Sequence, residues 1–260
     1  MNKYVKIYGE RNTGTNYLMK LIKLNFNVKV FRGIEPLYLF MWPYFFYFMF
    51  PPLYKKIPFG RWIIDNYFKL SLPKNLGWKH SMISSDVLKS IDNFSGMVFF
   101  VTITKNPYSW LLSLHNRPYH TQDKYDSFEE FLIKPWVTWS RDNYYKNFKN
   151  PIEMWNIKNK SYIDLSKKYN VKNIRYEDLL NDFNSLLSKL SDFFDIDKKF
   201  DSFKNVGKST KGDKKDFDFY KNYYLNELWK DKLSDDSIDI INSILDESVL
   251  DFFGYKKIGK

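Results

Sequence analysis

The sequence predicts an α/β protein with an open, mostly parallel sheet flanked by helices. Short β-branched or apolar runs alternate along the chain with stretches of helical periodicity, which is the pattern of such a sheet. The run Met97–Thr104 is almost continuously apolar, as expected for a strand that is covered on both faces of a parallel sheet. A glycine-containing turn at residues 9–16 joins a first β-branched run to a first helical stretch, which gives the order strand, loop, helix.

The remaining elements follow from the same periodicities. In the first half we expect strands at residues 5–8, 28–31 and 76–81, the last ending in a loop, and a helix at 17–25. Pro107 suits the first turn of a helix after the apolar strand. In the second half we expect helices at 127–132, 162–169, 179–194 and 237–253, a strand at 173–176 and a loop at 203–220. Gly254 closes the last helix.

One domain is expected over residues 1–260, because the sequence shows no internal repeat and no long linker. An aromatic insertion occupies about residues 34–75, and its centre at 37–53 carries no charge. The length of this centre approaches that of a membrane span, but Pro43, Pro51 and Pro52 interrupt it. We interpret it as a buried insertion. A flap that contacts a membrane surface and a spanning helix are the alternatives.

The net charge and the composition limit the classes of binding partner and metal site that the chain can have. The net charge of +11 favours anionic partners such as nucleotides, acidic glycans, membrane surfaces or nucleic acid. The absence of cysteine excludes disulfides and thiolate metal sites, and three histidines argue against a histidine-rich metal site. The amino terminus lacks the pattern of a signal peptide, so we expect a cytoplasmic or peripheral membrane protein.

The loop at residues 9–16 has the spacing Gly-x4-Gly of a phosphate cradle. Backbone N–H groups at residues 13–16, at the start of a helix, can bind a phosphate. Arg11 adds a cation, and Thr13 and Thr15 add hydroxyl donors. Thr15 stands where a nucleotide triphosphatase carries its lysine. The pattern therefore predicts a site for a phosphorylated nucleotide without the usual clamp for a β/γ-phosphate and magnesium.

Two other loops carry polar groups at predicted strand ends, where open α/β sheets bind ligands. Lys105 ends the apolar strand, and Ser113 follows eight residues later, so a bend is needed to bring the two together. Lys79 and His80 follow a Gly-Trp pair. His80 could accept a proton from a hydroxyl, and Lys79 could stabilise a leaving oxyanion. Each feature alone also fits an ordinary turn or a solvated side chain.

Together these motifs resemble the sulfotransferases that use 3′-phosphoadenosine-5′-phosphosulfate (PAPS). In that family the first strand–loop–helix binds the 5′-phosphate side of PAPS, and a basic residue with a serine eight positions later holds the 3′-phosphate. A Lys/His element often includes the catalytic base, a Tyr-Glu-Asp sequence follows a late strand, and a Lys/Gly-rich loop closes over the cofactor. The matching residues here are Arg11, Asn12, Thr13, Gly14, Thr15 and Asn16, then Lys79 with His80, Lys105 with Ser113, Tyr176 with Glu177 and Asp178, and Lys211 with Gly212.

The sequence departs from that family's pattern at three places. Asn12 stands where the family usually has lysine, and Arg11 would supply the cation instead. Lys105 stands where the family usually has arginine. Lys79 and His80 are contiguous, where many members place a residue between them.

The resemblance implies transfer of a sulfonate group from PAPS to a hydroxyl or amine, without a metal. His80 would be the base, Arg11 and Lys79 would neutralise charge on the leaving group, and Glu10 or His120 would be the base if His80 is not. The expected acceptor is a carbohydrate or glycolipid, since the aromatic insertion could line its site and residues 37–53 could contact a membrane. A P-loop kinase or NTPase, and a non-catalytic basic protein that binds a membrane or nucleic acid, stay open. No nucleic-acid-binding signature occurs.

Overall fold

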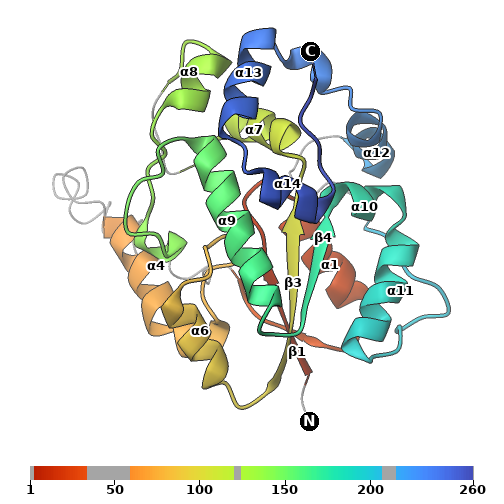
Figure 1. Cartoon of the computed structure of the whole chain (residues 1–260). Helices are drawn as coiled ribbons and strands as arrows, with labels where there is room; N and C mark the ends of the chain where they lie inside the picture. Colours follow the sequence, from red (N-terminus) through yellow and green to blue (C-terminus); the bar gives the residue numbers. More distant parts are fainter. Residues whose placement is uncertain (1–2, 34–58, 120–123, 207–214, 260) are drawn as a thin grey trace, which may run out of the picture.

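The computed structural model describes residues 3–33, 59–119, 124–206 and 215–259 (Figure 1). The side chains of residues 59–61 are also left undescribed. Several predictions therefore lie outside the described residues. They concern the aromatic run 37–53, His120, Lys211 and Gly212.

Four parallel strands form one sheet in the order β2-β1-β3-β4. They are β1 (Lys3–Tyr8), β2 (Lys29–Val30), β3 (Met97–Thr104) and β4 (Val171–Arg175). In the register Tyr8 pairs with Thr102, and Thr104 pairs with Arg175, so the carboxyl ends of the three longer strands meet at one edge. The predicted open, parallel sheet flanked by helices is confirmed.

Helices cover both faces of this sheet (Figure 1). On one face Val5, Phe99 and Val101 pack in a core with α1 (Thr15–Asn25) and α11 (Phe183–Phe194). On the other face Tyr8 and Phe100 pack with α6 (Ser85–Asp92) and α9 (Pro151–Ser166). The first half contains α1 (Thr15–Asn25), α4 (Phe59–Leu70), α5 (Leu72–Asn75), α6 (Ser85–Asp92) and α7 (Pro107–Asn116). The second half contains α8 (Phe128–Ile133), η1 (Ser140–Asp142), α9 (Pro151–Ser166), α10 (Tyr176–Asn181), α11 (Phe183–Phe194), α12 (Phe217–Leu225), η2 (Lys230–Lys232), α13 (Asp235–Ile244) and α14 (Glu247–Phe253).

The predicted strand at residues 76–81 is wrong, because this segment is a turn. Leu76 and Gly77 both have positive φ, at 56° and 81°, which an extended strand cannot accommodate. Two side chains of β1 hold the turn in place. The ammonium group of the buried Lys6 donates to the carbonyls of Asn75, at 2.7 Å, and Gly77, and the Tyr8 hydroxyl donates to the Leu76 carbonyl.

Two predicted helices are each divided in the structure. The predicted helix at 179–194 covers the end of α10 and all of α11, with a break at Asp182, whose carboxylate caps α11 by accepting from the N–H of Ser185. The predicted helix at 237–253 breaks at Leu245, and Asp246 then caps α14. A cap fixes non-helical backbone angles, and periodicity alone does not show where it falls. The end of α14 at Gly254, with φ 68°, is as predicted.

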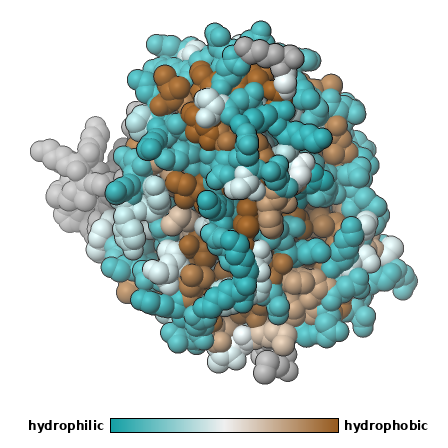
Figure 2. Space-filling model, in the orientation of Figure 1, coloured by the Kyte–Doolittle hydropathy of each residue, from teal (hydrophilic) through white to brown (hydrophobic). Residues whose placement is uncertain are grey.

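Hydrophilic side chains cover most of the face shown in Figure 2, with hydrophobic ones between them. Scattered apolar side chains of this kind are ordinary on a protein surface. Among the described residues, no helix is both long and apolar enough to cross a membrane.

Candidate functional site

The loop between β1 and α1 has the backbone of an anion cradle. Gly14 precedes α1 with φ 90°, and a Cβ added there would lie 2.6 Å from the Tyr176 ring, so the position requires glycine. Asn12 also has positive φ, at 66°, which asparagine tolerates better than most residues. Gly14 brings no side-chain cap to α1. The N–H groups of the first turn are thus available to an anion at the positive end of the helix.

Arg11 lies in this loop between aromatic rings. Its guanidinium carbon is 4.7 Å from the centroid of Tyr119 and 5.6 Å from that of Trp78. The indole N–H of Trp110 donates to the Arg11 carbonyl at 2.8 Å, which ties the loop to α7. The Nε atom of Arg11 is buried, and within the described part of the chain it has no hydrogen-bond partner. A buried donor left open beside the cradle is a place where an anion would be stabilised.

The other predicted residues of the loop have different surroundings. The hydroxyl of Thr13 donates to the Glu10 carbonyl at 2.6 Å, so it already serves the turn. Thr15 is buried at the first position of α1. Asn16 is exposed, and its side-chain oxygen accepts from the ammonium group of the buried Lys79. The structure thus brings Lys79 to the start of α1.

His80 is buried directly behind the loop. Its Nδ1 lies 2.6 Å from the Gly9 carbonyl oxygen. Because a carbonyl oxygen can only accept, Nδ1 carries the proton and Nε2 has the free lone pair. Burial, with the nearby cations Lys79, Arg11 and Lys158, lowers the pKa of His80 well below its usual range. The imidazole is therefore neutral at neutral pH, in the tautomer that a general base requires.

Lys105 and Ser113 come together across the bend between β3 and α7. The Nζ atom of Lys105 lies 2.8 Å from the Ser113 hydroxyl oxygen, because Pro107 starts α7 immediately after β3. Nζ also lies 3.8 Å from the centroid of Tyr224 and 5.6 Å from that of Tyr176. Lys105 is fully buried, and no described carboxylate forms an ion pair with it. Burial lowers the pKa of Lys105 to about 7, against the opposing effect of Glu177.

The Tyr176 ring lies between the loop at residues 9–16 and Lys105. It packs against Gly14, so closely that a Cβ there would collide with it, and it also adjoins the ammonium group of Lys105. The anion cradle and the buried amine of Lys105 are thus neighbours of one aromatic side chain, at the edge where the strands end.

A buried group of charges beside the loop was missed by the sequence analysis. Glu10 forms an ion pair with Lys158 of α9, which also lies 2.9 Å from a carboxylate oxygen of Asp142. The Tyr119 hydroxyl donates to Glu10 at 2.5 Å. One signal was present in the sequence, because Lys158 lies on the buried side of α9 between Trp155 and Tyr162.

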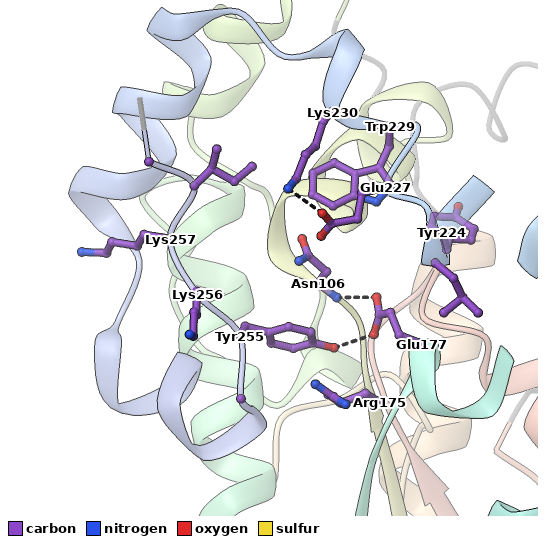
Figure 3. Close-up of a pocket in the computed structure, with 14 residues that line it drawn as sticks. Asn106, Arg175, Glu177, Tyr224, Glu227, Trp229, Lys230, Tyr255, Lys256 and Lys257 are labelled. Carbon is purple, nitrogen blue, oxygen red and sulfur yellow. Dashed lines mark hydrogen bonds and ion pairs between the residues drawn. The ribbon is translucent and has the colours of Figure 1, made fainter. Parts of the chain in front are cut away.

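A cavity of about 550 Å³ lies among α10, α12, η2 and the carboxyl-terminal tail (Figure 3), and its lining includes Tyr224, whose ring adjoins the ammonium group of Lys105. In Figure 3 Glu177 stands between two donors, the N–H of Asn106 at 3.0 Å and the hydroxyl of Tyr255 at 2.7 Å. Glu177 of the matched Tyr-Glu-Asp sequence belongs to its described lining, whereas the loop at residues 9–16, Lys79 and His80 do not.

Searches with this chain found no matching protein-family model and no matching curated protein. Solved structures do resemble it. The sulfotransferase domain from the curacin biosynthetic pathway aligns with a TM-score of 0.47 and 12% identity, over 99% of each chain. The sulfotransferase domain of the Synechococcus PCC 7002 olefin synthase aligns with a TM-score of 0.46 and 12% identity, over 93% of this chain and 94% of that one. Mouse sulfotransferase SULT7A1 complexed with PAP aligns with a TM-score of 0.43 and 15% identity, over 93% of this chain and 88% of that one.

All three descriptions contain the word sulfotransferase, which is the class that the motifs of this sequence resemble. Their TM-scores stay below 0.5 and their identities at 12–15%, so these similarities give no residue of this chain a role. The function has to be argued from the geometry of its own site.

Proposed function

We propose that this chain transfers a sulfonate group from PAPS to an acceptor hydroxyl or amine. The observation that carries the proposal is a pair of anion-binding groups that both adjoin Tyr176. One is the cradle with the open Nε of Arg11, and the other is the buried amine of Lys105, which forms no ion pair with a carboxylate of the described residues. A nucleotide with one phosphate group on each side of its ribose would satisfy both.

The residues present fit such a nucleotide. The first-turn N–H groups of α1 and Arg11 would hold the 5′ side, and Lys105 with Ser113 would hold the 3′-phosphate. Tyr176 would lie between them, and Lys211 and Gly212 are proposed to cover the nucleotide. When bound, PAPS supplies the sulfonate group that is transferred.

The side chains near the cradle suit the transfer. Nε2 of His80 accepts the proton of the acceptor hydroxyl, because Nδ1 already donates to the Gly9 carbonyl. Lys79 and Arg11 stabilise the negative charge that develops on the phosphate of the leaving nucleotide. Glu10 is a poorer base, since its carboxylate accepts from Lys158, Tyr119 and the N–H of Arg11.

We further propose a carbohydrate or glycolipid as the acceptor. A pocket of about 170 Å³ borders Trp78, whose ring stands 4.9 Å from that of His80. The pocket combines apolar and polar groups, among them Phe68, Asp86, Ser140 and Asn143. An aromatic wall with hydroxyl-binding side chains fits a sugar ring. Contact of residues 37–53 with a membrane is part of this proposal for a glycolipid.

Titration calorimetry with 3′,5′-adenosine bisphosphate, alongside magnesium-ATP, tests the donor site. We expect the bisphosphate to bind without added metal, and more tightly than magnesium-ATP. Tighter binding of magnesium-ATP would contradict the proposal and favour a kinase or NTPase. Binding of neither would favour a non-catalytic basic protein.

His80→Ala then tests the base. This variant should bind the bisphosphate like the wild-type protein and lose sulfonate transfer from PAPS to a panel of sugars by roughly 10²- to 10⁴-fold, the usual contribution of a general base. Full turnover in this variant would move the role of the base to another residue.

A further inference from the structure

Lys158 is fully buried and lies where three segments meet. From α9 it donates to the Glu10 carboxylate in the phosphate loop, to the His80 carbonyl at 2.9 Å and to Asp142 of η1 at 2.9 Å. A lysine ammonium group has three donor hydrogens, so each one has a partner. Two carboxylates offset the cation, and the pKa of Lys158 is raised, since Asp142 and Glu10 together outweigh the burial that lowers it.

The partners of Lys158 are themselves fixed. Glu10 accepts from the Tyr119 hydroxyl and from the N–H of Arg11, both at 2.5 Å, and Asp142 accepts from the N–H of Trp139 at 2.9 Å. The loop and the His80 turn also touch directly, since the N–H of Gly9 donates to the Lys79 carbonyl at 3.0 Å. Neither segment is a helix or a strand, so contacts of this kind determine their relative position.

We propose that Lys158 is a positioning residue, which holds the phosphate loop and the His80 turn in one arrangement by binding both at once. The inference rests on the proposed function of the site. In this proposal Lys158 acts through Glu10 and the backbone of His80, to which its ammonium group donates. A displacement of about 1 Å between reacting groups can lower a rate about 10²-fold, so a buried link of this kind matters for turnover as well as for folding.

The charges around His80 predict a second, independent effect of Lys158, on the pKa of His80. Lys79 faces His80 from its own turn, Arg11 from the loop and Lys158 from α9, and all three lower its pKa in addition to burial. Removal of Lys158 takes away one cation and breaks its ion pairs with Glu10 and Asp142. The pKa of His80 should then rise. Removal of the Asp142 charge leaves Lys158 less compensated, and the pKa of His80 should fall further.

Lys158→Met and Asp142→Asn test the proposal, with Lys160→Met as a matched control. Lys160 lies on the same helix but is exposed, with its Nζ 3.8 Å from Asp246. The measurements are kcat for sulfonate transfer, the affinity for 3′,5′-adenosine bisphosphate, and the titration of the three histidines by NMR, with the His80 signal assigned from His80→Ala.

We expect Lys158→Met to lower kcat by about 10²-fold while the affinity for the bisphosphate changes far less. The His80 signal should titrate at higher pH in this variant and at lower pH in Asp142→Asn, and Lys160→Met should match the wild-type protein. A folded Lys158→Met protein with unchanged kcat and an unchanged His80 titration would overturn the proposal. So would equal losses of kcat and affinity that follow the folded fraction alone.

The experiment separates failure of the proposed function from failure of the Lys158 proposal. If the wild-type protein neither binds the bisphosphate nor transfers sulfonate, the proposed function fails, while the histidine titration still decides whether Lys158 controls the His80 environment. If Lys158→Met does not fold, Asp142→Asn tests the proposal by the direction in which the pKa of His80 shifts.

Discussion

Lys105 and Lys158 are both fully buried lysines near the carboxyl edge of the sheet, yet their surroundings differ in charge. Lys158 has two carboxylates, and its pKa is raised. Lys105 has a hydroxyl and two aromatic rings, and its pKa falls to about 7. A buried cation that is paired with carboxylates has a structural role in the folded protein. A buried amine without them is a place for a ligand that brings the negative charge.

The largest expected effect concerns stability. Lys158→Met should lower the free energy of unfolding by about 3–5 kcal/mol, because it removes the buried ammonium group that both Glu10 and Asp142 bind. Lys105→Met should leave it unchanged or raise it, because it removes a buried amine that forms no ion pair among the residues the structure describes. Urea unfolding of both variants measures this difference. Equal losses in the two variants would contradict the distinction between the two lysines.

The second effect concerns binding. Lys105→Met should weaken binding of 3′,5′-adenosine bisphosphate by about 10- to 100-fold, the value of hydrogen bonds to a charged group. Lys105→Arg keeps the cation and is the matched variant, with affinity closer to that of the wild-type protein. Calorimetry gives both values. Wild-type affinity in Lys105→Met would remove Lys105 from the donor site.

The third effect is the pH dependence of that binding. The free protein has a Lys105 pKa of about 7, and a bound phosphate dianion would raise it, so binding takes up a proton above pH 7. Affinity for the bisphosphate should therefore fall as pH rises from 7 towards 9, by at most about tenfold per pH unit. His80 does not titrate in this window, since its pKa is lowered. Lys105→Arg should show a flat profile, and an equally steep profile there would assign the dependence to another group.

The smallest effect is at the surface. Lys257 and Glu247 form an ion pair at 2.8 Å, but the Glu247 side chain is 76% exposed. Lys257→Met should leave the free energy of unfolding almost unchanged, as is usual for exposed ion pairs. Urea unfolding of Lys257→Met and Lys158→Met under the same conditions measures the difference, with Lys257→Met as the reference for a lysine at the surface. A loss comparable to that of Lys158→Met would show that burial is not what separates them.

The sequence by itself determined the parallel sheet, the glycine-containing loop at residues 9–16 and the Lys105–Ser113 pair. An apolar strand, a glycine turn and a spacing of eight residues are local patterns, because residues close together in the sequence specify each of them. The first strand, the first helix and the helix after Pro107 are found close to their predicted residues.

Only the tertiary structure decided the state of the buried charges and the turn at residues 76–81. Glu10, Lys158 and Asp142 are far apart in sequence, and their pairing depends on how α9 and η1 pack against the loop. Leu76 and Gly77 adopt positive φ in a turn that side chains from β1 hold by its carbonyls. Long-range packing sets both features, because a buried ionisable group is stable only where distant segments supply its partners.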